Sequence, residues 1–229
     1  MREHQDHSTH RRSFLGRLIG GGAALALGGL GARRADAAPL AAAGSRSASW
    51  DERWLDRITG KHRQVFDAVS VGDGIVLAFA VNFLDTNKEA YSLTDKDLTA
   101  VIVARHAAIP MVFSDAIWAK YKLGEMLSIT DPRTKAPAVR NIFIDRRPDE
   151  MLLPGMAVDL LQQRGVIFTC CNVALTFMSG HAAAGAGVSP EAAKDDWTRG
   201  LLDGVTIVPS GVLAVNRAQE KECTYCYAG

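Results

Sequence analysis

The side chains of this sequence that are suited to catalysis or binding gather in three short segments. These are Arg105-His106, Cys170-Cys171-Asn172 and Pro209-Ser210-Gly211, and each follows a run of apolar residues typical of a buried strand. In an open parallel α/β sheet, ligands bind in the crevice beyond the carboxyl ends of the strands. We therefore expect the three segments to lie near one another, with a cysteine as the reactive group.

Cys171 is the residue that we expect to carry the chemistry. The predicted strand ends there, and Asn172 is a good N-cap for a helix that begins at Val173. A thiol that faces a helix N-terminus can have its pKa lowered from about 8.5 into the range of roughly 3.5 to 7.5, which gives a reactive thiolate at neutral pH. The alternative is an inert buried thiol, because cysteine is among the most buried residue types.

Cys170 and Asn172 are secondary candidates, and His106 is the candidate partner of the thiol. The side chain of Cys170 points to the opposite face of a strand from that of Cys171. The two are awkward disulfide partners, because adjacent Cα atoms lie about 3.8 Å apart and bridges usually need about 4.4 to 6.8 Å. His106 is expected in the same crevice as a base or proton donor, and a hydrogen-bonded structural histidine is the alternative.

A second cysteine pair, Cys223 and Cys226, has the spacing of a redox motif. The flanking tyrosines favour an extended strand instead, in which the two thiols lie about 10 Å apart on opposite faces. A direct disulfide is then excluded unless the segment turns. Zinc binding is a weak alternative, because no second ligand pair with regular spacing accompanies the motif, and we expect no metal site.

Composition and missing motifs exclude several functional classes. The chain has 229 residues, of which 48% are hydrophobic and 22% charged, and its net charge is +1. This is the balance of a globular protein, without the basic surplus that nucleic-acid binding requires. The sequence has no dinucleotide-binding glycine motif after a strand, no phosphate-binding P-loop and no nucleophile elbow, so we expect no cofactor.

The first 49 residues have the pattern of an export signal followed by a tether. Arg11 and Arg12, followed by Phe-Leu, resemble the twin-arginine export motif, and small residues surround a cleavage site between Ala37 and Ala38. The intervening apolar stretch is shorter than the roughly 20 residues of a membrane-spanning helix. We expect cleavage of residues 1–37, no membrane span afterwards, a periplasmic location and a flexible linker over residues 38–49.

The remaining residues, 50–229, alternate between strand and helix patterns. Strands separated by helices of about 10 to 15 residues predict one three-layer α/β domain, with a mostly parallel sheet and helices on both faces. Residues 125–155 interrupt the alternation as a proline-rich excursion with at most a short strand at 141–144, and a lid, an oligomer contact or a plain surface insertion would each account for it. The expected strands are 63–69, 98–104, 166–171, 205–208 and 224–227, and the expected helices are 54–58, 75–84, 114–124, 156–164, 172–184, 190–202 and 210–221.

The strand that ends at Cys171, the cap Asn172 and the following Val173-Ala174-Leu175 form a recognisable motif, and the run 203–212 and Ala218-Gln219-Glu220 follow it. With them the chain resembles the DsrE-like family of sulfur-relay proteins, mainly over residues 156–229. The resemblance implies a flavodoxin-like parallel α/β fold and assembly as a trimer or hexamer. It also implies that sulfur is carried as a persulfide on the cysteine after the central strand, which is Cys171 here.

Two functions remain open at this point. In the first, Cys171 accepts or donates sulfane sulfur, His106 assists proton transfer, and a sulfur donor or acceptor protein is the partner. In the second, the protein is a non-catalytic oligomeric binding module of the same fold whose cysteines are structural. Selective modification of Cys171 near neutral pH favours the first, and an unreactive thiol favours the second.

Overall fold

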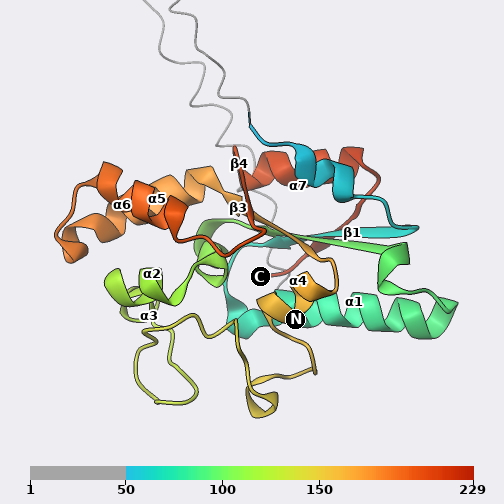
Figure 1. Ribbon diagram of the computed structural model, residues 1–229, viewed down its shortest axis with the longest axis horizontal. Helices are drawn as coiled ribbons and strands as arrows, with labels where there is room; N and C mark the ends of the chain where they lie inside the picture. The colour runs from blue at the N-terminus through green and yellow to red at the C-terminus, as the bar shows by residue number, and fades with distance from the viewer. Residues whose placement is uncertain (1–49) are drawn as a thin grey trace, which may run out of the picture. The chain divides into compact units, whose positions relative to one another are not determined.

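A computed structural model of the protein describes residues 50–229, in which five strands form one sheet (Figure 1). The predicted signal, the linker, Arg11, Arg12 and the Ala37–Ala38 cleavage site lie outside the described residues. The strand order is β4-β3-β2-β1-β5, and every neighbouring pair is parallel. The strands are β1 (His62–Ala68), β2 (Leu98–Ala104), β3 (Ile167–Cys171), β4 (Thr206–Val208) and β5 (Thr224–Tyr227).

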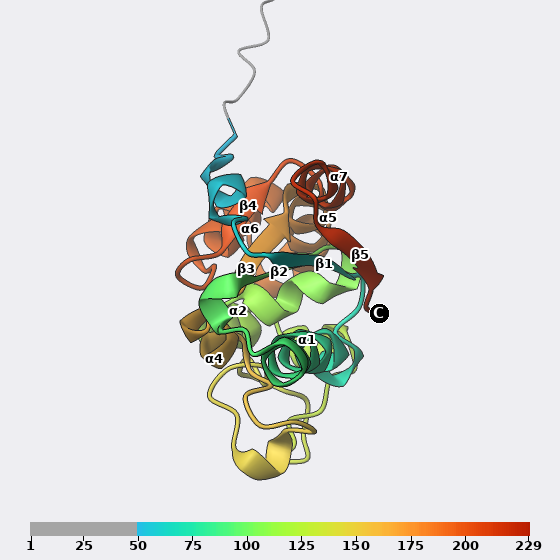
Figure 2. The ribbon, with the colours of Figure 1, turned by 90° about the vertical axis from the view of Figure 1, so that its right-hand side faces the viewer.

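Helices cover both faces of this sheet, which confirms the predicted three-layer α/β class with a parallel sheet. Figure 2 shows α1 on one side of the sheet and α7 on the other, whereas α5 and α6 pack together beyond the carboxyl ends of the strands (Figure 1). The helices are α1 (Ile75–Tyr91), α2 (Asp115–Lys120), α3 (Leu123–Met126), α4 (Val158–Gln163), α5 (Asn172–Ala183), α6 (Pro190–Arg199) and α7 (Gly211–Glu220). Short 3-10 helices cover Arg53–Arg57, Gly72–Gly74, Asp95–Asp97, His106–Val112, Pro148–Glu150 and Ala184–Ala186.

The alternation of side chains along the strands produces two separate cores. Phe66, Ile102 and Phe168 face the layer that contains α1, whereas Val65 and Val101 face the layer that contains α7. All seven residues of β2 are buried, as expected for a central strand covered on both sides. The five strands predicted from the sequence are confirmed to within one or two residues at each end.

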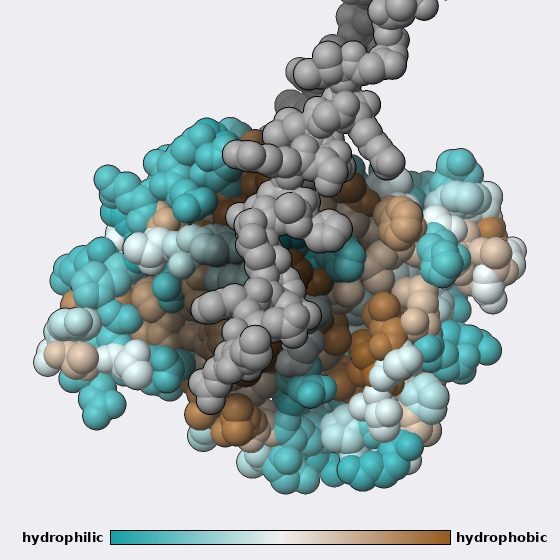
Figure 3. All heavy atoms as spheres, turned by 180° about the vertical axis from the view of Figure 1, so that it is seen from behind, coloured by the Kyte–Doolittle hydropathy of each residue, from teal (hydrophilic) through white to brown (hydrophobic). Residues whose placement is uncertain are grey.

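Hydrophilic residues predominate at the margin of the face drawn in Figure 3, and hydrophobic residues are visible towards its middle. Within residues 50–229, no helix has both the length and the apolar character needed to cross a membrane.

The end of α1 differs from the sequence prediction, whereas its start at Ile75 agrees with it. The N-cap is Gly74, in the left-handed region at φ 83°. The helix was expected to end before the polar residues 85–88, but it continues to Tyr91. Asp85 lies on its outer surface and pairs with Arg164 at 2.7 Å, which shows that this polar run is the solvent-facing side of the helix.

The region after β2 also differs from the prediction. One helix was expected from Ser114 to Gly124, but α2 ends at Lys120 and Gly124 lies inside the separate short helix α3. A Cβ atom added at Gly124 would stand 2.2 Å from the backbone nitrogen of Ala138. The absence of a side chain therefore lets the excursion pack directly against α3.

The excursion is fixed to the body of the domain by buried polar contacts. Asn141 is fully buried, and its side-chain amide donates to the carbonyl oxygens of Met111 and Phe113, both at 2.8 Å. These bonds replace a sheet ladder, so the short strand expected at 141–144 does not form. Two bidentate ion pairs, Arg140 with Asp131 and Arg133 with Glu150, close the segment on itself. The excursion is therefore an ordered segment packed against the domain.

Candidate functional site

A cavity of about 540 Å³ lies where the strand ends β2, β3 and β4 meet the first turns of α5 and α7. All three of the segments selected from the sequence contribute to its wall, as the sheet topology requires. Its lining residues are Arg105, His106, Ala107, Met126, Leu127, Cys171, Val173, Ala174, Phe177, Met178, His181, Ser210, Gly211 and Val212. A second cavity, of about 510 Å³, is lined by residues 50–53, Leu55, Asp56, Arg217 and Lys221 and holds neither cysteine nor histidine.

Cys171 is itself the N-cap of α5, which corrects the prediction that Asn172 would cap this helix. The helix begins at Asn172, and the backbone N–H of Ala174 donates to the Cys171 sulfur at 3.4 Å. The sulfur therefore occupies the position that a serine or aspartate oxygen takes in an ordinary cap. This position lies at the positive end of a helix of 12 residues, where negative charge is stabilised.

Cys170 and Asn172, the two secondary candidates, do not line the cavity. Cys170 has no exposed surface and belongs to the core on the α1 side of the sheet. Burial strongly raises the pKa of its thiol, which keeps the sulfur protonated and unreactive. Cys171 is also buried, at 5% exposed, and belongs to the same apolar cluster, but it alone of the two cysteines also lines the cavity.

His106 stands on the rim of the cavity, in a backbone conformation that few side chains adopt. Its φ is 50°, in the left-handed region, and its ring Nδ1 lies 3.3 Å from the carbonyl oxygen of Val69. Since a carbonyl can only accept, Nδ1 carries the proton in this contact, and Nε2 of the neutral ring is left as an acceptor. The contact orients the imidazole, and the ring is exposed to solvent.

Arg105 is held beside the cavity by a buried carboxylate that the sequence analysis did not select. Its Nε and Nη2 donate to the two carboxylate oxygens of Asp67, at 2.6 and 2.8 Å, and the hydroxyl of Tyr225 donates to the same carboxylate at 2.9 Å. The pKa of Arg105 is raised, first by its hydrogen bond to Asp67. Arg105 and Cys171 both line the cavity.

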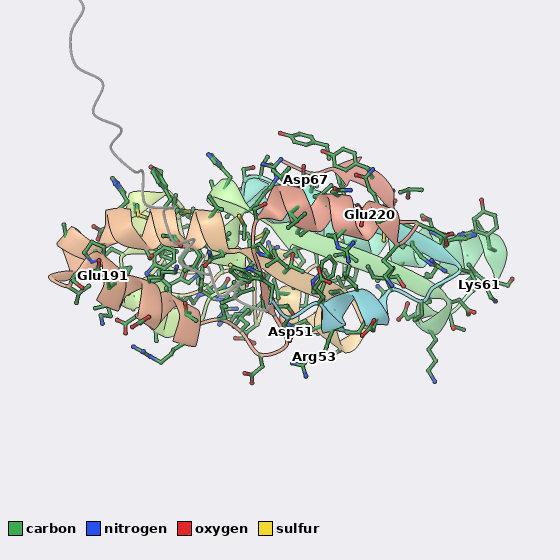
Figure 4. The ribbon with its side chains drawn as sticks, turned by 90° about the horizontal axis from the view of Figure 1, so that it is seen from above. Asp51, Arg53, Lys61, Asp67, Glu191 and Glu220 are labelled. Carbon is green, nitrogen blue, oxygen red and sulfur yellow. The ribbon has the colours of Figure 1, made fainter. Side chains whose placement is uncertain are left out.

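Asp67 lies near the carboxyl end of β1, at the end of the sheet opposite Lys61 (Figure 4). The signal that could have identified it is a single acidic residue among the apolar residues Val65, Phe66 and Ala68 at the end of this strand. Such a carboxylate is rarely buried without a cationic partner. Asp67 pairs with Val103 of the neighbouring strand β2, and Arg105 comes directly after that strand. Arg105 is therefore the cation that the sheet brings closest to Asp67 in sequence register.

The first turn of α7 forms the opposite wall of the cavity. Ser210 is the N-cap, and its hydroxyl oxygen accepts from the N–H of Leu213 at 3.1 Å. A Cβ atom added at Gly211 would meet the Cβ of Arg105 at 2.5 Å, so this glycine allows the arginine stem to lie against the helix start. His181 lies in the last turn of α5 and also lines the cavity.

The C-terminal cysteines lie on opposite faces of the sheet, as predicted from the strand pattern. Cys223 belongs to the core beneath α7, and Cys226 packs against the core of the α1 side. Both are free thiols, and burial raises their pKa values, that of Cys223 to about 11. Among the described residues, no group of three or more histidine, cysteine or acidic side chains is arranged to hold a metal ion.

Comparisons with known proteins leave the family of the chain open. No family model matches it, and no curated protein matches it. A solved structure of a protein of unknown function, MTH1491 from Methanobacterium thermoautotrophicum, is similar over 72% of this chain and 98% of that one. The identity is 17% and the TM-score is 0.37.

Proposed function

We propose that this protein carries sulfane sulfur as a persulfide on Cys171. The observation that carries the proposal is the placement of the Cys171 sulfur as the N-cap of α5, where it accepts the Ala174 N–H and opens into a cavity beside Arg105. The helix N-terminus and the guanidinium of Arg105 both supply positive charge at this cavity. The resemblance to DsrE-like sulfur-relay proteins agrees with this assignment.

The transfer needs no oxidant or cofactor. The Cys171 thiolate attacks the terminal sulfur of a donor, a new S–S bond forms at Cys171, and the donor's own S–S bond breaks. The donor leaves with the electron pair of that bond. An acceptor nucleophile then attacks the outer sulfur of the persulfide and releases the Cys171 thiolate. The proton of the resting thiol passes to His106, whose ring stands at the same cavity.

Mass spectrometry of each cysteine after exposure of the folded protein to a sulfane-sulfur donor tests this function. The addition of one sulfur atom to Cys171, near neutral pH and before any other cysteine is modified, is the expected result. An unreactive Cys171 would favour the second function, a non-catalytic oligomeric binding module. Light scattering on the same sample would test the proposed trimer or hexamer.

Replacement of His106 tests its role as the group that assists proton transfer. Asparagine is the suitable substitute, because it tolerates the left-handed backbone that His106 adopts, whereas alanine adds strain there. We expect His106→Asn to move the pH profile of Cys171 alkylation towards higher pH, since the thiol would lose the group proposed to accept its proton. His62→Asn is the matched control, because His62 lies at the start of β1 and does not line the cavity. An unchanged profile would remove His106 from the site.

We also propose that the protein is exported through the twin-arginine pathway and works in the periplasm. The proposal rests on Arg11, Arg12 and the small residues before Ala38. Replacing Arg11 and Arg12 by lysine should leave the uncleaved precursor in the cytoplasm, as seen by fractionation and immunoblotting. Normal appearance of a mature chain that begins at Ala38 would contradict the twin-arginine route and leave a general signal peptide in place.

A further inference from the structure

The cavity at Cys171 is larger and more apolar than the transfer of a sulfur atom from a small inorganic donor requires. Its volume of about 540 Å³ falls within the range of roughly 300 to 1,000 Å³ that is usual for sites of organic ligands. Apart from the polar groups near the sulfur and His181 in the last turn of α5, its wall is built mainly from Met126, Leu127, Val173, Phe177, Met178 and Val212. These side chains can be desolvated by an apolar ligand but cannot hydrogen-bond an inorganic one.

Several of these wall residues are unusually exposed for apolar side chains. Phe177 is 76% exposed, Val212 68% and Val173 61%. Val173 and Phe177 are four residues apart on α5 and therefore lie on the same face of the helix, next to the sulfur at its N-terminus. Val212 faces them from the first turn of α7. An apolar body placed between the two helices would remove all three side chains from water.

The polar end of the cavity favours a negatively charged group. Arg105 uses Nε and Nη2 to bind Asp67, but its Nη1 has no hydrogen-bond partner among the described residues. Cys171 lies in the same wall, so an anion that contacts Nη1 is placed beside the sulfur. The site thus has an apolar half and a cationic half, and the Cys171 thiol lies in the cationic half.

We infer that the sulfur donor of this site is an organic sulfane-sulfur compound with an apolar body and an anionic sulfur-bearing end, such as an aromatic thiosulfonate. The inference rests on the proposed function of Cys171. In the step, the thiolate attacks the outer sulfur of the thiosulfonate, and the bond between that sulfur and the sulfonyl sulfur breaks. The electron pair leaves on an organic sulfinate, so charge and oxidation states balance without another reactant. Arg105 binds the departing anion, and the apolar wall holds its organic group.

The test compares two thiosulfonates that differ only in the organic group, with cyanide as the sulfur acceptor and the full chain as the enzyme. The rate of thiocyanate formation gives kcat/KM for benzenethiosulfonate and for methanethiosulfonate. Each value is divided by the rate constant of the same donor with free cysteine, and the normalised ratio is the quotient of the two results. We expect the normalised ratio to favour the benzene compound by at least about tenfold, the size of effect that a few buried methylene groups produce. A ratio near one, with sulfur still reaching Cys171, would overturn the inference and leave the proposed function intact.

Substitutions test whether the apolar wall of the cavity causes the preference for the benzene compound. Phe177→Ser should reduce the normalised ratio at least about fivefold, because it removes the largest apolar side chain from α5. Phe79→Ser is the matched control, since Phe79 is also an exposed phenylalanine on a helix but does not line the cavity, and it should keep the ratio. A ratio that Phe177→Ser leaves unchanged counts against the inference.

Binding of the product distinguishes failure of the ligand class from failure of the chemistry. If neither donor transfers sulfur to Cys171, the proposed function is wrong, and calorimetry on Cys171→Ser then decides the ligand class. Benzenesulfinate is expected to bind more tightly than methanesulfinate, and weaker binding after Phe177→Ser is expected in that background. Equal affinities, or no binding of either anion, would overturn the inference.

Discussion

Replacing Cys171 with serine is expected to abolish the uptake of sulfane sulfur while leaving the fold intact. No other thiol lines the cavity, so the loss should be on the order of 10³-fold or more, as is usual when a nucleophile is removed. Serine is a better N-cap than cysteine, and its hydroxyl can accept the Ala174 N–H that the sulfur accepts now. Thermal denaturation should therefore show a midpoint equal to or slightly above that of the unaltered protein.

The other three cysteines are the controls for this substitution. Cys170→Ser should retain labelling but lower stability by about 1 to 3 kcal/mol, because it places a hydroxyl without a partner in the core. Cys223→Ser and Cys226→Ser should retain labelling as well, since both thiols lie away from the cavity. Sulfur uptake that survives Cys171→Ser and is lost in one of these three would contradict the assignment.

Replacing Gly124 with alanine is expected to be the most destabilising single change of a glycine to alanine in this domain. The added Cβ would lie 2.2 Å from the nitrogen, 2.3 Å from the oxygen and 2.8 Å from the carbonyl carbon of Ala138. These are backbone atoms, so no flexible side chain can move aside, and the excursion must shift away from α3. We expect a loss of about 3 kcal/mol and a fall in Tm of roughly 6 to 12 °C.

Gly185→Ala is the matched control for the crowding argument. A Cβ atom at Gly185 meets nothing within 4 Å, and its backbone is not left-handed. Alanine there should leave Tm unchanged or raise it slightly, because it restricts the unfolded chain. Differential scanning calorimetry of both variants provides the comparison. Equal midpoints would show that the excursion can move away from α3 at little cost.

Local patterns in the sequence were sufficient to predict the layers of the fold. The apolar, β-branched run 98–104 is a strand over those same residues, and Gly165, at φ 90°, closes α4 as expected. Such features depend on neighbouring residues, whose burial and backbone preferences the sequence shows directly. The convergence of Arg105, Cys171 and Ser210 on one cavity was predictable for a related reason, since parallel strands bring their carboxyl ends to one edge.

Features that depend on distant residues were not predictable. Asp67 could be recognised as a site residue only once Arg105 and Tyr225 were known to reach it. The excursion is rich in proline and charged residues, and its sequence does not show that Asn141 anchors it through contacts with residues about 30 positions earlier. The shift of the cap from Asn172 to Cys171 has a simpler origin, because helix boundaries are uncertain by a residue or two even when the helix itself is clear.

The position of β5 beside β1 affects the order in which the sheet and the cavity can assemble. Tyr225 and Asp67 are separated by 158 positions, yet their hydrogen bond helps to hold Arg105 at the cavity. A chain still being synthesised has β1 with one open edge and an Asp67 carboxylate that lacks its tyrosine partner. The four other strands can assemble first, but the cluster of Arg105, Asp67 and Tyr225 is complete only once β5 has paired with β1.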